Sequence, residues 1–282
     1  MRYGILADVH GNLFALQAAV GRLREEGVDG WLCAGDLVGY GPHPSECVEV
    51  VAELGAACVA GNHELLVLGE LPEGRAGRLA RETTAWTRGE LREDCRSFLA
   101  RLPMVVTVED LVMAHGSLAS PEEYVTGEAQ AAGQLRRLGA EHPGSRLLVV
   151  GHTHRPWLYS RERGTVAPGG GGDAALPRAE RFLLNPGSVG QSRQREREPR
   201  ARCMLVDTER RRVRFYAVPY DVAASRQALR RHGLPRDGVH VRPGPLATLE
   251  RRSRNLLRRS LAATGLSRRR RSARRRPAPR HR

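Results

Sequence analysis

Residues 4–12 read Gly-Ile-Leu-Ala-Asp-Val-His-Gly-Asn, an apolar run that ends in the polar residues Asp8, His10 and Asn12. The uninterrupted apolar character of residues 3–7 predicts a buried strand, and leucine and valine recur at helical spacing directly afterwards. Asn12 precedes this helical pattern and is interpreted as a helix cap, because an asparagine side chain accepts hydrogen bonds from the first helical turn. The stretch therefore predicts a strand, a polar turn and a helix.

The same alternation of strand and helix continues along the chain. Apolar runs over residues 31–34 and 57–60 predict two more strands, and residues 44–54 predict a helix with Pro44 in its first turn. The remaining expected elements are helices over residues 75–101, 128–138 and 223–232, a hairpin of 105–108 with 111–114, and strands over 147–150, 157–160, 181–184, 203–207 and 213–218. This order indicates an α/β fold with helices on the faces of a sheet.

The overall composition is that of a globular protein, with 282 residues of which 40% are hydrophobic and 27% are charged. No apolar run approaches the roughly 20 residues that span a bilayer. The first residues lack the pattern of a signal peptide. The five cysteines are odd in number and form no Cys-x-x-Cys pair, so buried thiols are expected rather than disulfides or a thiolate zinc site. These features predict a cytoplasmic protein.

The net charge of +15 comes from the C-terminal part of the chain. Residues 251–282 contain 14 arginines and no acid, whereas the preceding 250 residues hold 32 basic side chains against 31 acidic ones. We therefore expect a folded domain over residues 1–250 and an arginine-rich, disordered tail over residues 251–282. Three interpretations of the tail stay open: contact with nucleic-acid phosphates, attachment to an anionic membrane surface, or an extension without a function.

Five short polar motifs each follow an apolar strand. They are Asp8-Val9-His10-Gly11-Asn12, Gly35-Asp36, Gly61-Asn62-His63-Glu64, His115-Gly116 and Gly151-His152-Thr153-His154. Open α/β sheets place their sites beyond the carboxyl ends of the strands, so the five loops are predicted to meet in one crevice. Residues i and i+2 of an extended chain point to the same side, which predicts that Asp8 and His10 reach one metal ion together. His152 and His154 are predicted to serve two adjacent metal ions.

The ligand types and the charge balance favour two divalent cations. Imidazole suits zinc, iron, manganese or nickel, while carboxylate and amide oxygens suit the harder of these ions. Two divalent cations bring four positive charges, of which Asp8 and Asp36 neutralise two. The remainder suits a hydroxide and an anionic phosphate, and paired metals about 3.5–4 Å apart stabilise attacking and leaving oxygens together. Asp36 is the candidate bridge, because one carboxylate offers two oxygens.

The ordered set of motifs resembles that of the calcineurin-like metallophosphoesterases. A closer similarity to the small bacterial and archaeal phosphodiesterase-type proteins lies in residues 35–42, Gly-Asp-Leu-Val-Gly-Tyr-Gly-Pro, and 185–190, Asn-Pro-Gly-Ser-Val-Gly. The resemblance covers roughly residues 1–235. It implies a four-layer αββα sandwich, in which two packed mixed β-sheets are flanked by helices.

The resemblance also implies roles for single residues. One metal ion would be bound by Asp8, His10, Asp36 and His154. The other would be bound by Asp36, Asn62, His115 and His152. His63 would lie beside the scissile phosphate, where it stabilises charge or protonates the leaving oxygen. Members of the family cleave phosphomonoesters, phosphodiesters or nucleotides.

The leading hypothesis is a phosphodiesterase in which a metal-bound hydroxide attacks phosphorus at a dinuclear centre, with manganese among the candidate metals. A nucleotidase or dinucleoside polyphosphate hydrolase is the first alternative, and its substrate would be a nucleotide. The second alternative is a metal-bearing scaffold or nucleic-acid-binding protein that acts through the tail.

Several residues keep two interpretations. Asn62 is either a ligand or a helix N-terminal cap. The loop holding Asn185, Gly187 and Ser188 is either a tight turn or a segment that orients His154 or the phosphate. Arg193 either clamps a phosphate or is a solvated surface arginine. Residues 166–180 are expected to form an enlarged loop, and Gly39 stands where many relatives carry a second acid. The remaining histidines are expected to be ordinary: His43, His142, His232, His240 and His281.

Overall fold

The computed structural model describes residues 1–167 and 172–242. Residues Met1–Val241 form one compact unit. The predicted boundary at residue 250 and the arginine-rich tail lie outside the described residues, as does His281. Within the described part of the chain, no helix has the length and apolar character needed to cross a membrane.

Two six-stranded mixed sheets form the centre of this unit. Sheet A has the spatial order β3 (Ala57–Cys58), β2 (Gly30–Cys33), β1 (Arg2–Leu6), β11 (Ala201–Asp207), β12 (Arg212–Val218) and β9 (Asp173–Ala175). Sheet B has the order β4 (Val105–Val108), β5 (Leu111–Ala114), β6 (Leu147–Val149), β10 (Phe182–Asn185), β7 (Trp157–Ser160) and β8 (Gly164–Thr165). Strands β1, β2 and β3 run parallel to one another, and so do β5, β6 and β10.

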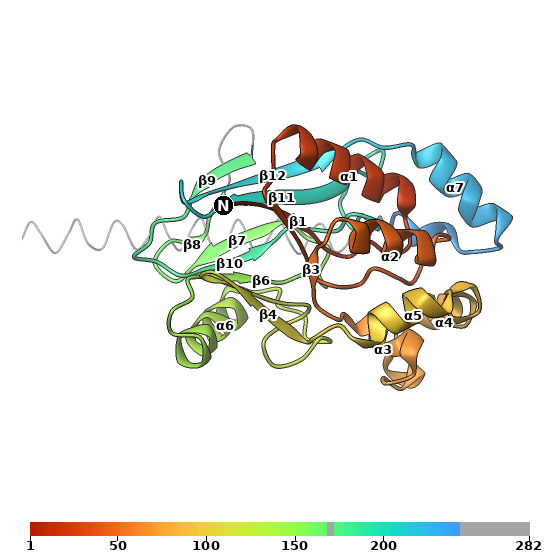
Figure 1. Cartoon of the computed structure of the whole chain (residues 1–282), viewed down its shortest axis with the longest axis horizontal. Helices are drawn as coiled ribbons and strands as arrows, with labels where there is room; N and C mark the ends of the chain where they lie inside the picture. Colours follow the sequence, from red (N-terminus) through yellow and green to blue (C-terminus); the bar gives the residue numbers. More distant parts are fainter. Residues whose placement is uncertain (168–171, 243–282) are drawn as a thin grey trace, which may run out of the picture. The chain divides into compact units, whose positions relative to one another are not determined.

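Helices cover the outer faces of the two sheets (Figure 1). Those beside sheet A are α1 (Leu13–Glu25) and α2 (Pro44–Glu53), and α7 (Val222–Arg231) packs on α1. Sheet B is covered by α6 (Glu128–Glu141), whose buried residues pack on β10 and β7. A separate group packs against α2, namely α3 (Asn62–Leu68), α4 (Arg78–Glu90) and α5 (Glu93–Ala100). The short 3-10 helices η1 (Glu73–Arg75) and η3 (Arg236–Gly238) complete the order.

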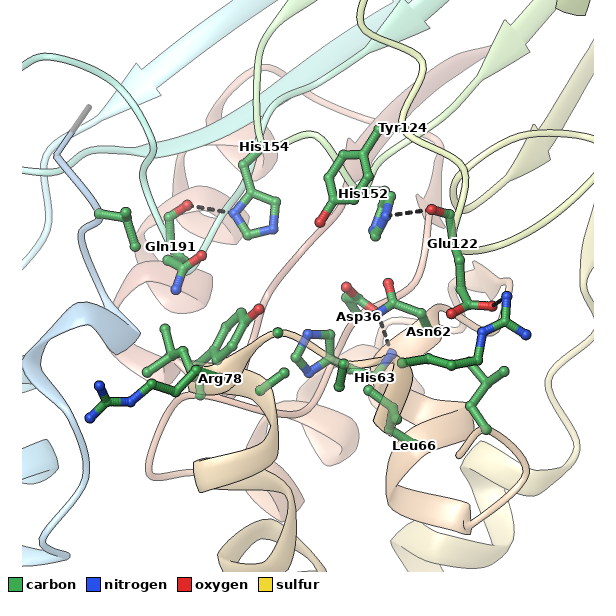
Figure 2. A pocket seen from close by; sticks show the side chains of 18 of the residues that line it. Asp36, Asn62, His63, Leu66, Arg78, Glu122, Tyr124, His152, His154 and Gln191 are labelled. Carbon is green, nitrogen blue, oxygen red and sulfur yellow. Dashed lines mark hydrogen bonds and ion pairs between the residues drawn. The ribbon is translucent and has the colours of Figure 1, made fainter. Parts of the chain in front are cut away.

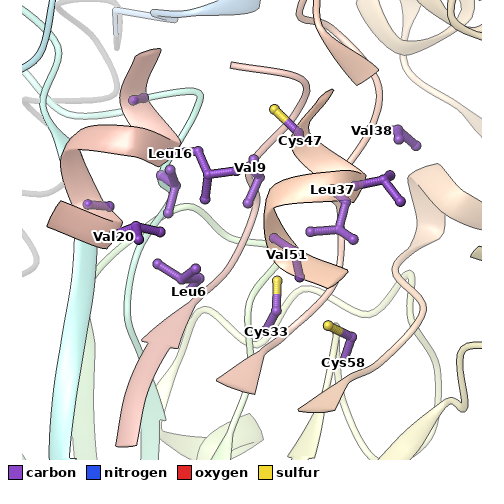
Figure 3. Close-up of a cluster of buried hydrophobic side chains, with 14 of the residues drawn as sticks. Leu6, Val9, Leu16, Val20, Cys33, Leu37, Val38, Cys47, Val51 and Cys58 are labelled. Carbon is purple, nitrogen blue, oxygen red and sulfur yellow. The ribbon is translucent and has the colours of Figure 1, made fainter. Parts of the chain in front are cut away.

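Three apolar clusters hold the four layers together. Figure 3 shows the cluster between α1, α2 and sheet A, which includes Leu6, Leu16 and Val51. The second cluster lies between the sheets and joins residues such as Ile5 of β1 to Phe182 of β10. The third packs α6 on sheet B. Each central strand is therefore buried on both faces, which explains the uninterrupted apolar runs. The predicted αββα sandwich is confirmed.

The structure confirms most predicted elements and corrects others. Asn12 caps α1, because its Oδ1 accepts a hydrogen bond from the backbone N–H of Ala15 at 3.3 Å. The segment of residues 75–101, predicted to form one or two helices, forms the two helices α4 and α5. Helix α3 was not predicted, since it starts inside a polar motif rather than in a periodic apolar pattern. The expected loop over residues 166–180 contains the short edge strand β9.

The layer between the sheets makes a prediction about stability. Phe182 is fully buried there, so Phe182→Ala leaves a cavity and is expected to lower the free energy of unfolding by about 3–5 kcal/mol. Met104→Ala is the matched control, because Met104 is 42% exposed, and its effect is expected to stay below about 0.5 kcal/mol. Urea denaturation measures both. Equal effects of the two substitutions would contradict the assignment of this layer as core.

Candidate metal centre

The five polar motifs follow β1, β2, β3, β5 and β6, and the structure brings them to one edge of the two sheets. Backbone hydrogen bonds tie the loops to one another. The N–H of Asp8 donates to the carbonyl of Gly35 at 3.0 Å, and that of Gly151 donates to the carbonyl of His115 at 2.7 Å. The structure therefore confirms that the loops converge.

The backbone at this edge is left-handed rather than extended. Among the described residues, eight other than glycine have positive φ, and five of them are candidate ligands: Asp8, His10, Asp36, His152 and His154. Such φ values are uncommon for residues with a Cβ, and they concentrate at functional sites. The expectation that an extended backbone points Asp8 and His10 to the same side is thus wrong. The two side chains meet because the turn is left-handed at both positions, not because they alternate along a strand.

Hydrogen bonds to backbone carbonyls fix the histidine tautomers on one side of the cluster. His10 Nδ1 lies 3.2 Å from the carbonyl of Val38, and His154 Nδ1 lies 2.8 Å from the carbonyl of Gln191. A carbonyl only accepts, so each Nδ1 carries the proton and each Nε2 presents a lone pair. These two Nε2 atoms face each other at 3.0 Å.

The same arrangement occurs on the other side of the cluster. His115 Nδ1 donates to the carbonyl of Ala34 at 2.6 Å, and His152 Nε2 donates to the carbonyl of Glu122 at 3.2 Å (Figure 2). The remaining nitrogens, His115 Nε2 and His152 Nδ1, are 3.3 Å apart. The amide oxygen of Asn62 lies 3.1 Å from His115 Nε2, so a third acceptor points to the same place.

Two buried carboxylates complete this set of acceptors. The Oδ2 atoms of Asp8 and Asp36 are buried and have no hydrogen-bond partner. Asp36 Oδ2 lies 3.2 Å from His115 Nε2 and 3.7 Å from His10 Nε2, which places it between the two histidine pairs. Acceptors crowded together without donors repel one another, and a bound cation is what satisfies all of them. The donor set therefore fits divalent metal ions.

Three overlapping groups of side chains could each hold a metal ion. The first is Asp8, His10 and His154, the second is Asp36, His115 and His152, and the third is His10, Asp36 and His63. Within each group the potential ligand atoms lie within 4.8 Å of one another. Asp36 belongs to two of the groups, in agreement with its predicted bridging position. The other described histidines lie outside these groups.

The electrostatics of the cluster favour metal coordination at three of the candidate ligands, His10, His154 and Asp36. His115 differs, because the charges of Asp36 and Asp8 outweigh burial and raise its pKa to about 9, so a cation would have to displace a proton from this ring. Burial lowers the pKa of His10 and His154 well below the ordinary value, so both imidazoles are neutral. Burial acts against ionisation of Asp36, yet the neighbouring His115 holds the pKa of this carboxyl well below its usual range. Burial also raises the pKa of Asp8 to about 7. A nearby cation would reverse this last shift, because positive charge stabilises the carboxylate.

Glu64 is a residue of this site that the sequence analysis did not identify. Its carboxylate accepts hydrogen bonds from four backbone N–H groups, those of Asp36, Leu37, Val38 and Gly61, at 2.7 to 3.2 Å. It thereby fixes the left-handed turn on which Asp36 sits. The alternative interpretation of Asn62 as an N-terminal cap is wrong, because Gly61 is the cap and Asn62 is the first residue of α3.

His63 projects from the first turn of α3 toward the cavity beside the cluster, and its ring is packed against the Tyr40 ring. Its backbone N–H donates to Asp36 Oδ1 at 2.9 Å, while its buried Nδ1 has no hydrogen-bond partner. Gly39 has a φ of 84°, and a Cβ at this position would lie 2.2 Å from His63 Nδ1. Glycine here therefore leaves the space that the imidazole occupies.

The loop of residues 185–190 lies beneath the cluster rather than on the cavity wall. Asn185 Nδ2 donates to the carbonyl of Gly151 at 2.7 Å, and its Oδ1 accepts from the N–H of Gly187. Ser188 Oγ donates to the carbonyl of Asp8 at 2.8 Å. These contacts orient the loops that carry the candidate ligands. Arg193, by contrast, lines the cavity, and its positive charge adds to burial in lowering the pKa of His154.

A cavity of about 460 Å³ opens directly onto the cluster. Figure 2 shows Asp36, His63, His152 and His154 around one space, with Tyr124 beside His152. Volumes of this order are usual for small-molecule sites.

Comparison with known proteins agrees with this geometry. The family model described as the calcineurin-like phosphoesterase superfamily domain matches residues 1–211. The chain belongs to this superfamily. The protein is thus a phosphoester hydrolase of a metal-dependent family, with Asp and His groups that could bind metal.

Two of the relatives of this phosphoesterase cover most of the chain, and a third covers about half. The crystal structure of a metallophosphoesterase from Sphaerobacter thermophilus is 34% identical, with a TM-score of 0.72, and covers 85% of this chain and 97% of its own. An uncharacterized protein of Methanocaldococcus jannaschii is 27% identical over 82% of this chain and 93% of its own length. The symmetrical bis(5'-nucleosyl)-tetraphosphatase of Vibrio parahaemolyticus is 31% identical over 49% of this chain and 53% of its own.

The acceptor cluster predicts that divalent cations stabilise the phosphoesterase. A cation at about a thousand times its Kd adds about 4 kcal/mol to stability, which corresponds to a rise in Tm of roughly 8–15 °C. We expect chelation followed by addition of manganese to show this rise in differential scanning fluorimetry. Asp36→Asn is expected to remove more than half of it, and His43→Gln, outside the cluster, to leave it unchanged. A full rise in the Asp36 variant would contradict this assignment.

The contact between Gly39 and His63 gives a second prediction. Gly39→Ala is expected to displace the imidazole and to lower kcat by about tenfold or more, while the metal-dependent rise in Tm persists. Gly55→Ala is the matched control, because Gly55 also has positive φ, at 61°, but a Cβ there meets no atom within 4 Å. Both variants place an alanine at positive φ. Equal loss of kcat in the two would show that strain, not the position of His63, is responsible.

Proposed function

We propose that this phosphoesterase is a cytoplasmic phosphodiesterase that holds two divalent cations, drawn from manganese, iron, zinc and nickel. The supporting observation is the convergence of seven buried or half-buried acceptor groups on three overlapping clusters, two of which contain Asp36. When bound, a pair of such cations supplies Lewis-acid stabilisation of phosphoryl oxygens and makes a water nucleophilic near neutral pH. The five buried free cysteines agree with a reducing compartment.

The two proposed ligand sets share Asp36, which lies between them. One cation is assigned to Asp8, His10, Asp36 and His154. The other is assigned to Asp36, Asn62, His115 and His152. The carbonyl partners of the four imidazoles fix which nitrogen of each ring takes part. Correct ring orientation is therefore built into the fold before a cation arrives.

His63 and Arg193 are proposed to act on the substrate. Both line the cavity, and neither is needed to complete the two ligand sets. We assign His63 the protonation of the leaving oxygen or the stabilisation of its charge. Arg193 binds a phosphoryl oxygen, since a guanidinium matches phosphate geometry. Asn185, Gly187 and Ser188 support the ligand loops from below and have no assigned contact with the substrate.

A diester fits the charges of the cavity better than a polyphosphate does. Three arginines line it, but Arg75 is paired with Glu122 at 2.8 Å and Arg78 with Glu82 at 2.6 Å. Arg193 forms no salt bridge among the described residues; its guanidinium contacts Gln191, and its charge acts on the Asp8 carboxyl at longer range. One guanidinium without a salt bridge suits a substrate with few charges beyond the reacting phosphate. Partial similarity to a tetraphosphatase nevertheless keeps dinucleoside polyphosphate hydrolysis as the second candidate.

The test is hydrolysis of bis-p-nitrophenyl phosphate, p-nitrophenyl phosphate and diadenosine tetraphosphate after chelation and after return of manganese, nickel, zinc or magnesium. We expect metal-restored cleavage of the diester. Asp36→Asn and His115→Ala are expected to lower kcat by about a hundredfold or more without unfolding the protein. His43→Gln, outside the site, serves as control.

Each departure from this result has a distinct meaning. Full turnover in either ligand variant or in chelated protein would overturn the metal-dependent mechanism. Preference for the monoester would indicate a phosphatase or nucleotidase, and preference for the tetraphosphate would indicate the second candidate. Metal binding without hydrolysis of any ester would favour the scaffold or nucleic-acid-binding hypothesis, in which residues 251–282 carry the function.

A further inference from the structure

The cavity beside the cluster has an aromatic wall that the proposed reaction does not use. Tyr124 lies in the segment between β5 and α6, and its ring packs against the His152 ring with centroids 3.9 Å apart and planes tilted by 34°. Although this ring is packed on one side, Tyr124 remains 47% exposed. Among the described residues it is one of only three large hydrophobic or aromatic side chains with such exposure.

Tyr124 forms part of the cavity wall. Tyr124 lines the cavity together with His152, and Figure 2 shows its hydroxyl directed into the space between His152 and His154. A ring that is packed on one face and open on the other is a stacking surface for a second planar group. Because His152 is a proposed ligand, a group stacked on Tyr124 would lie close to the reacting phosphate.

Other parts of the cavity wall are apolar. Side chains from α3, α4 and the segment between them contribute Leu66, Leu71, Ala76, Leu79 and Ala80. The volume of about 460 Å³ exceeds what a phosphate group alone requires, so the cavity has room for an organic substituent. Two of the three arginines on the wall are paired with acids, so the wall offers few free positive charges to a second anionic group.

We propose that the substrate is a phosphate ester of a nucleoside, or of a compound with a similarly planar ring, and that this ring stacks on the open face of Tyr124. The inference rests on the proposed phosphodiesterase function and names the class of group attached to the phosphate. Tyr124 is a specificity residue in this account, since it touches the substrate ring and takes no part in the transfer of the phosphoryl group.

The test measures binding, so that it is independent of turnover. The probes are the phosphonate analogues of adenosine 5'-monophosphate and of ribose 5-phosphate, in which a carbon–phosphorus bond replaces the hydrolysable ester bond. Isothermal titration with the manganese-loaded protein is expected to show about tenfold or more tighter binding of the adenosine analogue. Tyr124→Phe keeps the ring and is expected to preserve this ratio, whereas Tyr124→Leu is expected to bring it to within about twofold of unity.

A matched control removes another ring that packs on a histidine. Phe14 contacts His43 with ring centroids 5.5 Å apart, away from the cavity, so Phe14→Leu is expected to leave the ratio unchanged. Equal affinities of the two analogues in the wild-type protein, absence of binding of both, or an undiminished ratio in Tyr124→Leu would each overturn the proposal. Loss of the ratio in Tyr124→Phe would also overturn it, because the hydroxyl would then be responsible.

The outcomes for the two proposals are separable. A high binding ratio that depends on Tyr124, together with no cleavage of any diester, would leave the stacking surface in place and refute the phosphodiesterase. Metal-dependent diester cleavage with equal affinities for the two analogues would support the phosphodiesterase and refute the stacking surface.

Discussion

Repulsion between converging lone pairs is the constraint on which this structure depends. Imidazole nitrogens, carboxylate oxygens and an amide oxygen face one another at 3.0 to 3.7 Å with no donor between them. These side chains would not cluster in this way without the surrounding fold, because buried acceptors without partners cost free energy. The cluster persists because each imidazole is anchored through its other nitrogen to a carbonyl of a neighbouring loop. Packing of two sheets and their helices holds those loops in place, and the binding of cations would relieve the repulsion.

Backbone strain is the second cost that the fold has to offset. Left-handed residues at the ends of β1, β2 and β6 turn the side chains toward a common point, which extended strands could not do. Several devices stabilise these turns. The Glu64 carboxylate accepts hydrogen bonds from the backbone N–H groups of one turn. Asn185 and Ser188 form hydrogen bonds with backbone carbonyls of the other loops. Backbone hydrogen bonds also connect neighbouring loops directly. The residues that contact a substrate are thus fewer than the residues that make its binding possible.

Sequence predicted the parts of this design that are governed by local pattern. Buried strands such as residues 111–114 produce uninterrupted apolar runs, and Asn12 before a periodic segment indicates a cap, so both could be predicted. The rule that parallel strands of one sheet end at one edge accounts for the motifs after β1, β2 and β3 and, separately, for those after β5 and β6. Packing of the two sheets against each other is what joins the two groups. The role of Glu64 could not be predicted, because three of its four partners, Asp36, Leu37 and Val38, lie in a different loop of the chain. Tyr124 lacked any signal, since an isolated tyrosine in a polar segment is compatible with almost any environment.

The pairing of the first strand with one near the end of the folded unit has a consequence for biosynthesis. β1 lies between β2 and β11, with Arg2 opposite Asp207, and Ser188 bonds the carbonyl of Asp8 across 180 positions of sequence. Synthesis proceeds from the amino terminus, so the apolar β1 leaves the ribosome long before its partner exists. Assembly of the centre must wait until nearly the whole unit has been translated. A metal ion that requires the assembled centre would therefore bind only after these strands have been translated, and β1 would lack its β11 partner until then.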